Sequence, residues 1–234
     1  MHTEVHLEAV KGRSPRIRAT GGIAARQTGD AVLHLISTAA TPLGGDTIDI
    51  RVDLGCGSRL TVFSVAATVA LPSRGEPRSE LNWHVTVADG AQLVIDPLPT
   101  IVAAHAVHHS NTTVSVAGSG SVQITERVQI GRFGEDQGAW SGRLNADIDG
   151  SAAVRHQIRL GRRNHDRLGA PAVLISEFRY PDDREDVVHP DATAARLRPA
   201  TGGSLTTVLA DTMPRAEQLA GELRFLEEFA LPAN

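Results

Sequence analysis

The chain has 234 residues, a formal net charge of -4 at neutral pH, and 21% charged and 41% apolar residues. This balance is typical of a globular protein that buries one core, and it lacks the basic clusters expected of a nucleic-acid reader. Aromatic residues make up 3% of the chain, too few for base-stacking platforms. We therefore expect one domain spanning residues 1–234, with neither nucleic acid nor membrane as a partner.

The chain holds one cysteine, Cys56, and one lysine, Lys11. A single cysteine excludes an internal disulfide and is compatible with the cytoplasm, where we expect the protein to reside. The first residues show no basic segment followed by an apolar one, and no apolar run reaches the roughly 18 residues of a membrane helix. Schiff-base or lysine general-base catalysis would have to use Lys11, in the N-terminal stretch, so we discount this chemistry.

Residues 1–16 are polar, and we expect them to be irregular or loosely paired. Two short strands are predicted within Ile17–Ser37, of which Val32–Ile36 is the clearer. Thr41–Asp46 contains Pro42 and two glycines and predicts a turn. Thr47–Leu54 alternates apolar and polar residues as a half-buried strand does, and Arg59–Leu71 returns from a glycine turn. Residues 72–80 read as a loop.

Strands are predicted from Leu81 to about Leu160, followed by a polar connection over residues 161–170. Further strands are predicted at Val173–Tyr180 and around Ser204–Leu209. A helix is predicted over residues 211–230, because Asp211 or Thr212 can cap it and Pro214 suits its first turn. Its apolar face would carry leucines and phenylalanines at helical spacing: Leu219, Leu223, Phe225, Leu226 and Phe229.

One short pattern recurs four times: alternating apolar positions, a small-residue turn, then another apolar position. The copies begin at Val52, Val85, Val114 and, more weakly, Ala146, so they lie 33, 29 and 32 residues apart. Alternation around a glycine turn is typical of a β-hairpin, and recurrence near 30 residues favours a repetitive winding. We predict an all-β fold, a β-helix-like solenoid of antiparallel and parallel strands with a small C-terminal helical element.

Three histidines lie close together in the sequence: His105, His108 and His109. Imidazole is a common ligand for nickel, zinc and copper, so they are candidates for transient metal contact. On a strand, positions 105 and 109 would share one face and 108 the other. A polar surface strand with scattered histidines explains the group as well. Cys56, between two glycines, could bind a soft metal or simply fit a tight turn.

Charged residues Glu126, Arg127 and Arg132 interrupt an otherwise apolar strand pair, where they either line a polar interior or face solvent. No nucleophile elbow, glycine-rich phosphate loop or His-Glu-x-x-His motif is present. The sequence thus predicts a binding or scaffolding protein rather than an enzyme.

Four segments, in order, resemble the UreD (UreH) family of urease accessory proteins, in an actinobacterial-type branch. They are Gly45-Asp46 with Gly57-Ser58-Arg59-Leu60, Ser64-Val-Ala-Ala-Thr68, Pro97-Leu-Pro-Thr-Ile101, and Glu126-Arg-Val-Gln-Ile-Gly-Arg132. The chain departs from the family pattern at Val65 and Val69, where Gln and Lys are frequent, and at Leu71, where Tyr is. The Gly-Glu pair that follows Gly-Arg comes one residue early, at Gly134-Glu135.

The resemblance implies a non-enzymatic chaperone or scaffold that bridges apo-urease to UreF and the GTPase UreG during nickel insertion. It implies no tightly bound cofactor, transient Ni(II) in a polar interior channel, and room for a homodimer within the accessory complex. Channel or interface candidates by motif match are Asp46, Ser64, Thr68, Glu126 and Arg132. The C-terminal helix, with Leu219, Leu223, Leu226 and Phe229, would dock UreF or, as we favour, cover the sheet edge as a local lid.

Two other functions compete with this hypothesis. A cupin-type metal enzyme would use His105, His108, His109 and Glu126, although cupins space two histidines at i and i+2 with a nearby glutamate. A sugar-binding β-helix would need exposed aromatic faces, and the chain offers Trp83, Trp140 and Tyr180 besides five phenylalanines. The spacing disfavours the first, and the scarcity of aromatic residues disfavours the second.

Overall fold

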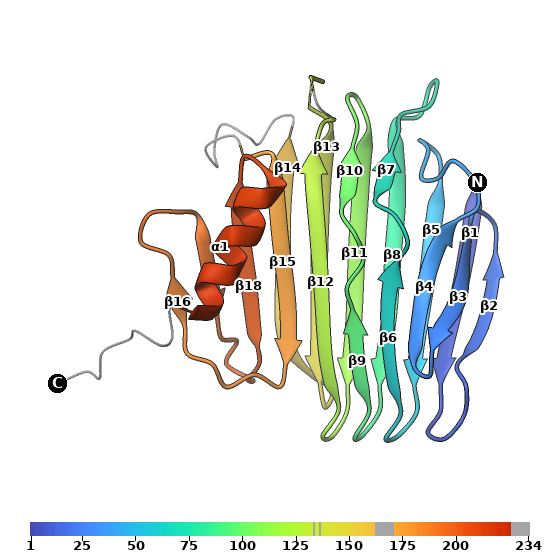
Figure 1. Ribbon diagram of the computed structural model, residues 1–234, viewed down its shortest axis with the longest axis vertical. Coiled ribbons are helices and arrows are strands. Elements are labelled where there is room, and N and C mark those ends of the chain that lie inside the picture. Colours follow the sequence, from blue (N-terminus) through green and yellow to red (C-terminus); the bar gives the residue numbers. More distant parts are fainter. Residues whose placement is uncertain (133, 136, 162–170, 226–234) are drawn as a thin grey trace.

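Two β-sheets packed face to face form the body of the protein in the computed structural model, which describes residues 1–132, 134–135, 137–161 and 171–225 (Figure 1). The first sheet, called sheet A, has the strand order β14-β13-β11-β8-β5-β1-β2. Its strands are β1 (His2–Ala9), β2 (Arg16–Thr20), β5 (Thr47–Leu54), β8 (Arg78–Val87), β11 (Val107–Val116), β13 (Ala139–Ile148) and β14 (Ser151–Gly161).

The second sheet, sheet B, has the order β16-β17-β18-β15-β12-β9-β6-β4-β3, with β7 and β10 attached beside β12. Its strands are β3 (Ile23–Gly29), β4 (Val32–Ser37), β6 (Arg59–Ser64), β7 (Thr68–Ala70), β9 (Gln92–Ile95), β10 (Thr100–Val102), β12 (Ser121–Ile130), β15 (Val173–Tyr180), β16 (Val187–Val188), β17 (Ala194–Leu197) and β18 (Ser204–Ala210).

The chain alternates between the two sheets, so that each coil lays one strand in sheet A and the next in sheet B. Strands β5, β8, β11 and β13 stack in parallel in sheet A, and β4, β6, β9 and β12 do so in sheet B. Antiparallel strands close both ends: β2 and β3 at one, and β14, β15, β17 and β18 at the other. The predicted all-β solenoid with parallel and antiparallel strands is confirmed.

The four sequence repeats stand in register across sheet A. Val52 pairs with Val85, Val85 with Val114, and Val114 with Ala146, and all four are at most 4% exposed. The hairpin interpretation was wrong for the first three copies, because β5–β6, β8–β9 and β11–β12 each lie in different sheets. Only the fourth copy folds back as a hairpin, β13–β14. After each of the first three turns the chain enters sheet B, where the returning strand pairs in parallel with a strand of an adjacent coil. This pairing takes the place of a hairpin.

Contacts between successive turns lock the coils together. The Gly57 amide donates to the Asp89 carbonyl at 2.9 Å, and the Asp89 carboxylate accepts from the amide and hydroxyl of Ser119. The Gly118 amide in turn donates to the Asp149 carboxylate at 2.7 Å. Gly57 and Gly118 both have positive φ, which favours glycine. The recurring turns therefore have a structural role, because hydrogen bonds link each turn to the turn of the next coil.

Residues 1–16 are not irregular as expected, since β1 occupies His2–Ala9 and pairs in parallel with β5 along its full length. The reason is the alternation of Thr3, Val5, Leu7 and Ala9, all of which are buried on one face. The polar residues between them face outward. A strand of sheet A needs only one apolar face, so the overall polarity of this segment was misleading.

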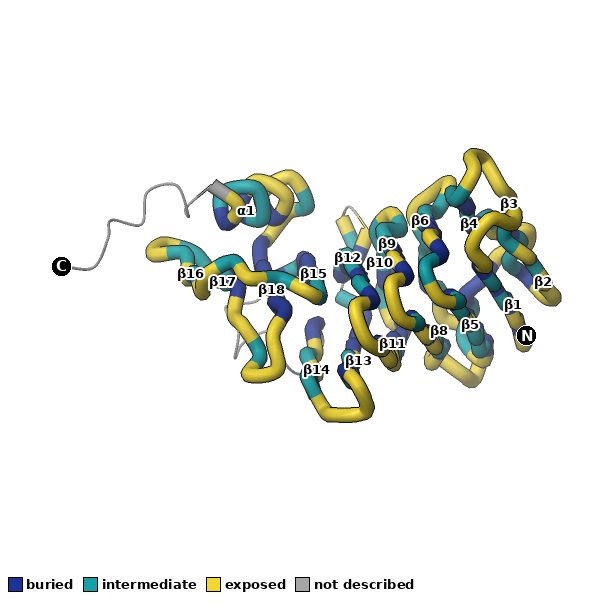
Figure 2. Tube along the Cα trace, turned by 90° about the horizontal axis from the view of Figure 1, so that it is seen from below, coloured by how far each residue is buried: buried dark blue, intermediate teal, exposed yellow. Residues whose placement is uncertain are grey.

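The predicted C-terminal helix is confirmed as α1 (Met213–Phe225), preceded by Thr212, whose hydroxyl accepts from the Arg215 amide. It lies on the outer face of sheet B, as Figure 2 shows. Leu219 and Leu223 pack with Val173, Ile175 and Val208 of the strands beneath. The expected segment 226–230, with Leu226 and Phe229, lies outside the described residues. Within the described part, no helix has the length and apolarity to cross a bilayer.

Candidate functional site

Sheet B is interrupted in two neighbouring coils. Strand β6 ends at Ser64 and β7 begins at Thr68; β9 ends at Ile95 and β10 begins at Thr100. The two linking segments are joined by the Leu98 amide, which donates to the Ser64 hydroxyl at 2.9 Å. Val65 and Leu98 are largely exposed here. Pro97 and Pro99 cannot donate to a ladder, which accounts for the break in the second coil.

A cavity of about 200 Å³ begins at this interruption and reaches between the sheets. Apolar side chains from both sheets form most of its wall, among them Ile48, Ile50, Leu81, Ile95 and Ile124. Its polar lining residues are Ser37, Ser64, Thr68, Thr100, His108, Thr112, Thr125, Glu126 and Arg127. The cavity also lies where the apolar core is interrupted, because along β12 Ile124 belongs to the larger core cluster and Val128 to the smaller one.

Glu126 extends from β12 of sheet B toward sheet A. Its carboxylate accepts a hydrogen bond from the Ser110 hydroxyl on β11, and burial raises its pKa to about 6. Gly142 of β13 leaves the space that this needs: a Cβ there would lie 3.2 Å from Glu126 Oε2 and 2.2 Å from the Trp140 ring. The carboxyl group therefore changes charge near physiological pH, inside the sandwich.

His108 faces the same interior from β11, two residues before Ser110. Its Nδ1 lies 2.9 Å from the Ser79 hydroxyl, and the residue is 1% exposed. Burial, aided by the nearby His109, lowers the His108 pKa to about 4. The ring is thus neutral at pH 7, and a neutral imidazole is the form that ligates metals. Since Ser79 engages Nδ1, Nε2 is the nitrogen left for a further contact.

The structure brings together four of the predicted residues, because Ser64, Thr68, His108 and Glu126 all line the cavity. Thr112 and Thr125 also line the cavity, and no sequence motif pointed to them. One signal could have found Thr112. On β11 the interior-facing positions run His108, Ser110 and Thr112 before Val114 and Val116, so the alternating pattern itself turns polar partway along the strand.

The three histidines do not form one group. His105 lies in a turn with φ of 65°, ahead of β11, so the expectation that it shares a strand face with His109 was wrong. His109 is on the outer face of sheet A, with Nδ1 2.8 Å from the Ser141 hydroxyl. His108 faces the interior. Adjacent strand residues point to opposite faces, which separates 108 from 109.

Other candidates have structural contacts away from the cavity. Asp46 accepts from the Thr41 hydroxyl and the Leu43 amide and pairs with the Met1 amino group; these contacts outweigh burial and lower its pKa. Arg132 pairs with Glu135, and the hydrogen bond from Arg132 lowers the Glu135 pKa to about 2. Cys56 is exposed in the first repeat turn.

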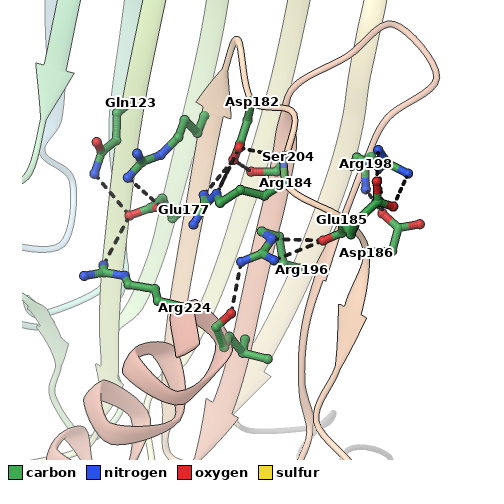
Figure 3. A network of polar contacts seen from close by, with 12 residues as sticks. Gln123, Glu177, Asp182, Arg184, Glu185, Asp186, Arg196, Arg198, Ser204 and Arg224 are labelled. Carbon is green, nitrogen blue, oxygen red and sulfur yellow. Dashed lines mark hydrogen bonds and ion pairs between the residues drawn. The ribbon is translucent and has the colours of Figure 1, made fainter. Parts of the chain in front are cut away.

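A second cavity, of about 220 Å³, lies beneath α1 on the outer side of sheet B and shares Thr125 and Arg127 with the first. Figure 3 shows its polar surroundings. Glu177, 6% exposed, accepts from Gln123 at 3.1 Å and pairs with Arg179 and with Arg224 of the helix.

Arg196 secures the C-terminal end of α1. Its guanidinium is almost fully buried and donates to the Leu223 carbonyl at 3.0 Å and to the Glu185 carbonyl (Figure 3). A cation at the carboxyl end of a helix satisfies free carbonyls and opposes the helix dipole. Nearby, Asp182 accepts from Arg184 and Ser204, which holds the chain between β15 and β16. The helix is thus a cover tied down by charge as well as by Leu219 and Leu223.

The competing site hypotheses gain no support. Trp83 and Trp140 are buried at 8% and 3% exposure, so neither offers a face to a sugar. A cupin site would need His108, His109 and Glu126 to converge, but His109 is on the opposite face of sheet A. Among residues 1–132, 134–135, 137–161 and 171–225, no group of three or more metal-ligating side chains surrounds a common point.

Comparisons with known proteins point in one direction. The family model described as "UreD urease accessory protein" matches residues 22–178. The chain is 42% identical over 120 residues to the urease accessory protein UreD of Frankia alni, covering 51% of this chain and 40% of the relative. It is 30% identical over 210 residues to UreD 1 of Saccharopolyspora erythraea, covering 86% and 81%. A UreD of Frankia casuarinae is 36% identical over 146 residues, covering 62% and 46%. The chain thus spans less than half the length of both Frankia relatives.

Proposed function

This chain belongs to the UreD family of urease accessory proteins, and we propose that it is a non-catalytic scaffold that delivers Ni²⁺ into apo-urease. The family match supports a role in urease maturation. What carries the proposal further is the interior cavity, where Glu126 and His108 come from different sheets to line one space. Glu126 also belongs to one of the motifs that resemble the family.

The donor chemistry fits a nickel ion in transit. Ni²⁺ prefers nitrogen and oxygen ligands, and a neutral imidazole with a carboxylate supplies one of each. Hydroxyl oxygens of Ser64, Thr68 and Thr112 continue the polar lining. Two strong donors hold a divalent ion less tightly than the three or four protein ligands of a closed site. An ion that must be handed on requires such weak retention.

The two cavities suggest a route. Because Thr125 and Arg127 line both, the interior space and the space beneath α1 lie on either side of the same stretch of β12. We assign the opening between β6–β7 and β9–β10 to one partner and the α1 side to another. The partners in this proposal are UreF, the GTPase UreG and the apo-urease subunits, and the compartment is the cytoplasm.

The role of the protein is tested in cells that carry urease genes but lack this gene, grown with limiting nickel. The expected result is inactive, nickel-poor urease that recovers activity on complementation with this chain. Affinity capture of the tagged chain is expected to retain apo-urease or UreF. Normal urease activity in the deletion strain would contradict the proposed role.

The proposed movement of nickel through the interior cavity is tested separately, by filling the cavity with a larger side chain. Thr68→Trp places a large ring at the opening, whereas Thr113→Trp adds the same ring on the exposed outer face of β11, outside the cavity. We expect the first variant to bind the partners but to lose most urease activation, and the second to activate normally. Equal activation by both would exclude the cavity as the route while leaving the scaffold role intact.

A further inference from the structure

The outer face of sheet A is charged unevenly, and its two ends differ in how those charges are paired. On β1 and β5 the carboxylates have partners: Asp53 accepts from Arg51 at 2.7 Å and lies 2.8 Å from His6, while Asp49 accepts from Asn82 at 2.9 Å. Glu8 lies 3.8 Å from Arg18. At this end the sheet compensates its own charge.

Toward β13 and β14 the compensation is incomplete: Arg155 pairs with Asp147, but three other arginines are left without such a partner. Arg78, Arg143 and Arg159 form no ion pair or side-chain hydrogen bond with any residue in the described part of the chain, although Glu80 lies beside Arg78 on the same face of β8. All three arginines line one hollow of about 420 Å³. Its floor is formed in part by the small side chains of Val107 and Ala139, which stand side by side in the register.

A hydrogen-bonding group without a partner among the described residues also lines this hollow. The His109 ring is fixed through Nδ1 by the Ser141 hydroxyl, while its Nε2 is buried with no partner among the described residues. If Ser141 donates to Nδ1, the neutral His109 ring carries its proton on Nε2 and can donate. Buried donors without acceptors are uncommon and call for an explanation.

We propose that this hollow binds an oxyanion, a phosphate or a carboxylate. Arg143 and Arg159 reach it from neighbouring strands and Arg78 from β8, so that their guanidinium forks can bind two oxygens at once. The site is separate from the interior cavity, since its lining is on the outer side of β11 and at the start of β13. Glu80 keeps the local charge below +3, which favours an exchangeable ligand over a permanent one.

Titration calorimetry with the full chain tests the proposal, using inorganic phosphate in one arm and acetylated triglutamate peptide in the other. The paired variant is Arg143→Ala with Arg159→Ala, and the control is Arg51→Ala, which removes a charge from the acidic end of the same face. We expect saturable binding of at least one probe, weakened about tenfold or more in the double variant and unchanged in the control.

The two arms separate the sources of the anion. Tighter binding of phosphate indicates a free inorganic ion, and tighter binding of the peptide indicates an acidic side chain of a partner protein. Because both arginines are exposed, the double variant is expected to keep the circular dichroism spectrum of the parent protein. No saturable binding of either probe at millimolar concentration, or equal weakening in Arg51→Ala, would overturn the proposal.

Discussion

Two regions of the solenoid share strands but differ in what those strands bury. One, the turn end, holds the repeat turns that follow β5, β8 and β11; the other, the interrupted middle, surrounds the breaks between β6 and β7 and between β9 and β10. At the turn end, apolar residues repeat in register from coil to coil, as Val52, Val85 and Val114 do. In the middle the same strands carry His108 and Ser110 inward, opposite Glu126, and sheet B is broken twice. A repeated apolar row stabilises the fold, whereas a polar interruption in that row costs stability and has to be explained by function.

Truncation in the turn-end core gives the largest expected effect on stability. Leu93 is 2% exposed and pairs with Leu60 and Val122 of the adjacent coils. We expect Leu93→Ala to lower the free energy of unfolding by about 2–5 kcal/mol in urea denaturation. Leu98→Ala, at the rim of the cavity, is the control and should change it by about 0.5 kcal/mol or less. Similar losses of unfolding free energy in both variants would show that the turn-end core and the cavity rim do not differ in their contribution to stability.

The buried histidine predicts an acid-side loss of stability. The His108 pKa falls from 6.5 to about 4 on folding, so the unfolded chain binds the extra proton first. Stability is complete above pH 6.5 and declines as the pH falls toward 4, by about 3 kcal/mol from this group. Denaturation of the parent protein and of His108→Asn across this range measures the difference. A pH dependence unchanged by the substitution would show that His108 titrates normally.

Glu126 predicts the opposite slope. Its pKa rises from 4.5 to about 6 on folding, so the native state binds the extra proton. Stability from this group is greatest below pH 4.5 and declines as the pH rises through 6, by about 2 kcal/mol. We expect Glu126→Gln to abolish this decline and to be at least as stable as the parent at pH 7. Lower stability of the variant at pH 7 would mean that the carboxylate serves structure rather than function.

The smallest effect concerns the cover helix. Thr212→Ala removes the hydroxyl that accepts the Arg215 amide and is expected to cost about 1 kcal/mol, while Thr212→Ser keeps the cap. Hydrogen exchange of the α1 amides should quicken in the first variant only, with β11 and β12 unaffected. Faster exchange throughout both sheets would show that the helix is integral to the core and not a local cover.

Much of the fold could be predicted from local patterns. The alternation in Thr47–Leu54, the apolar run that opens Val173–Tyr180, the glycine turns and the Thr212–Pro214 signal each placed an element correctly. What local pattern could not supply is the partner of each strand, since the same turn closes a hairpin at Gly150 and crosses between sheets at Gly57. β1 was missed because its apolar positions are small or interrupted by charge.

The site was partly predictable for a similar reason. Glu126, Ser64 and Thr68 were found through family motifs, and His108 through histidine density, but their meeting depends on strand register. Sequence proximity suggested that His108 and His109 act together, and the strand pleat placed them on opposite sides of sheet A. The second cavity depends on where α1 lies, which its own residues do not specify.

Whether nickel passes through the interior cavity can be read from the nickel content of urease matured in the presence of Glu126→Gln. Glu4→Gln, the same change at an exposed position on β1, is the control. Both variants should assemble with apo-urease to the same extent. We expect urease matured with Glu126→Gln to contain several-fold less nickel, and urease matured with Glu4→Gln to be fully loaded. Full nickel loading with Glu126→Gln would contradict passage through the cavity.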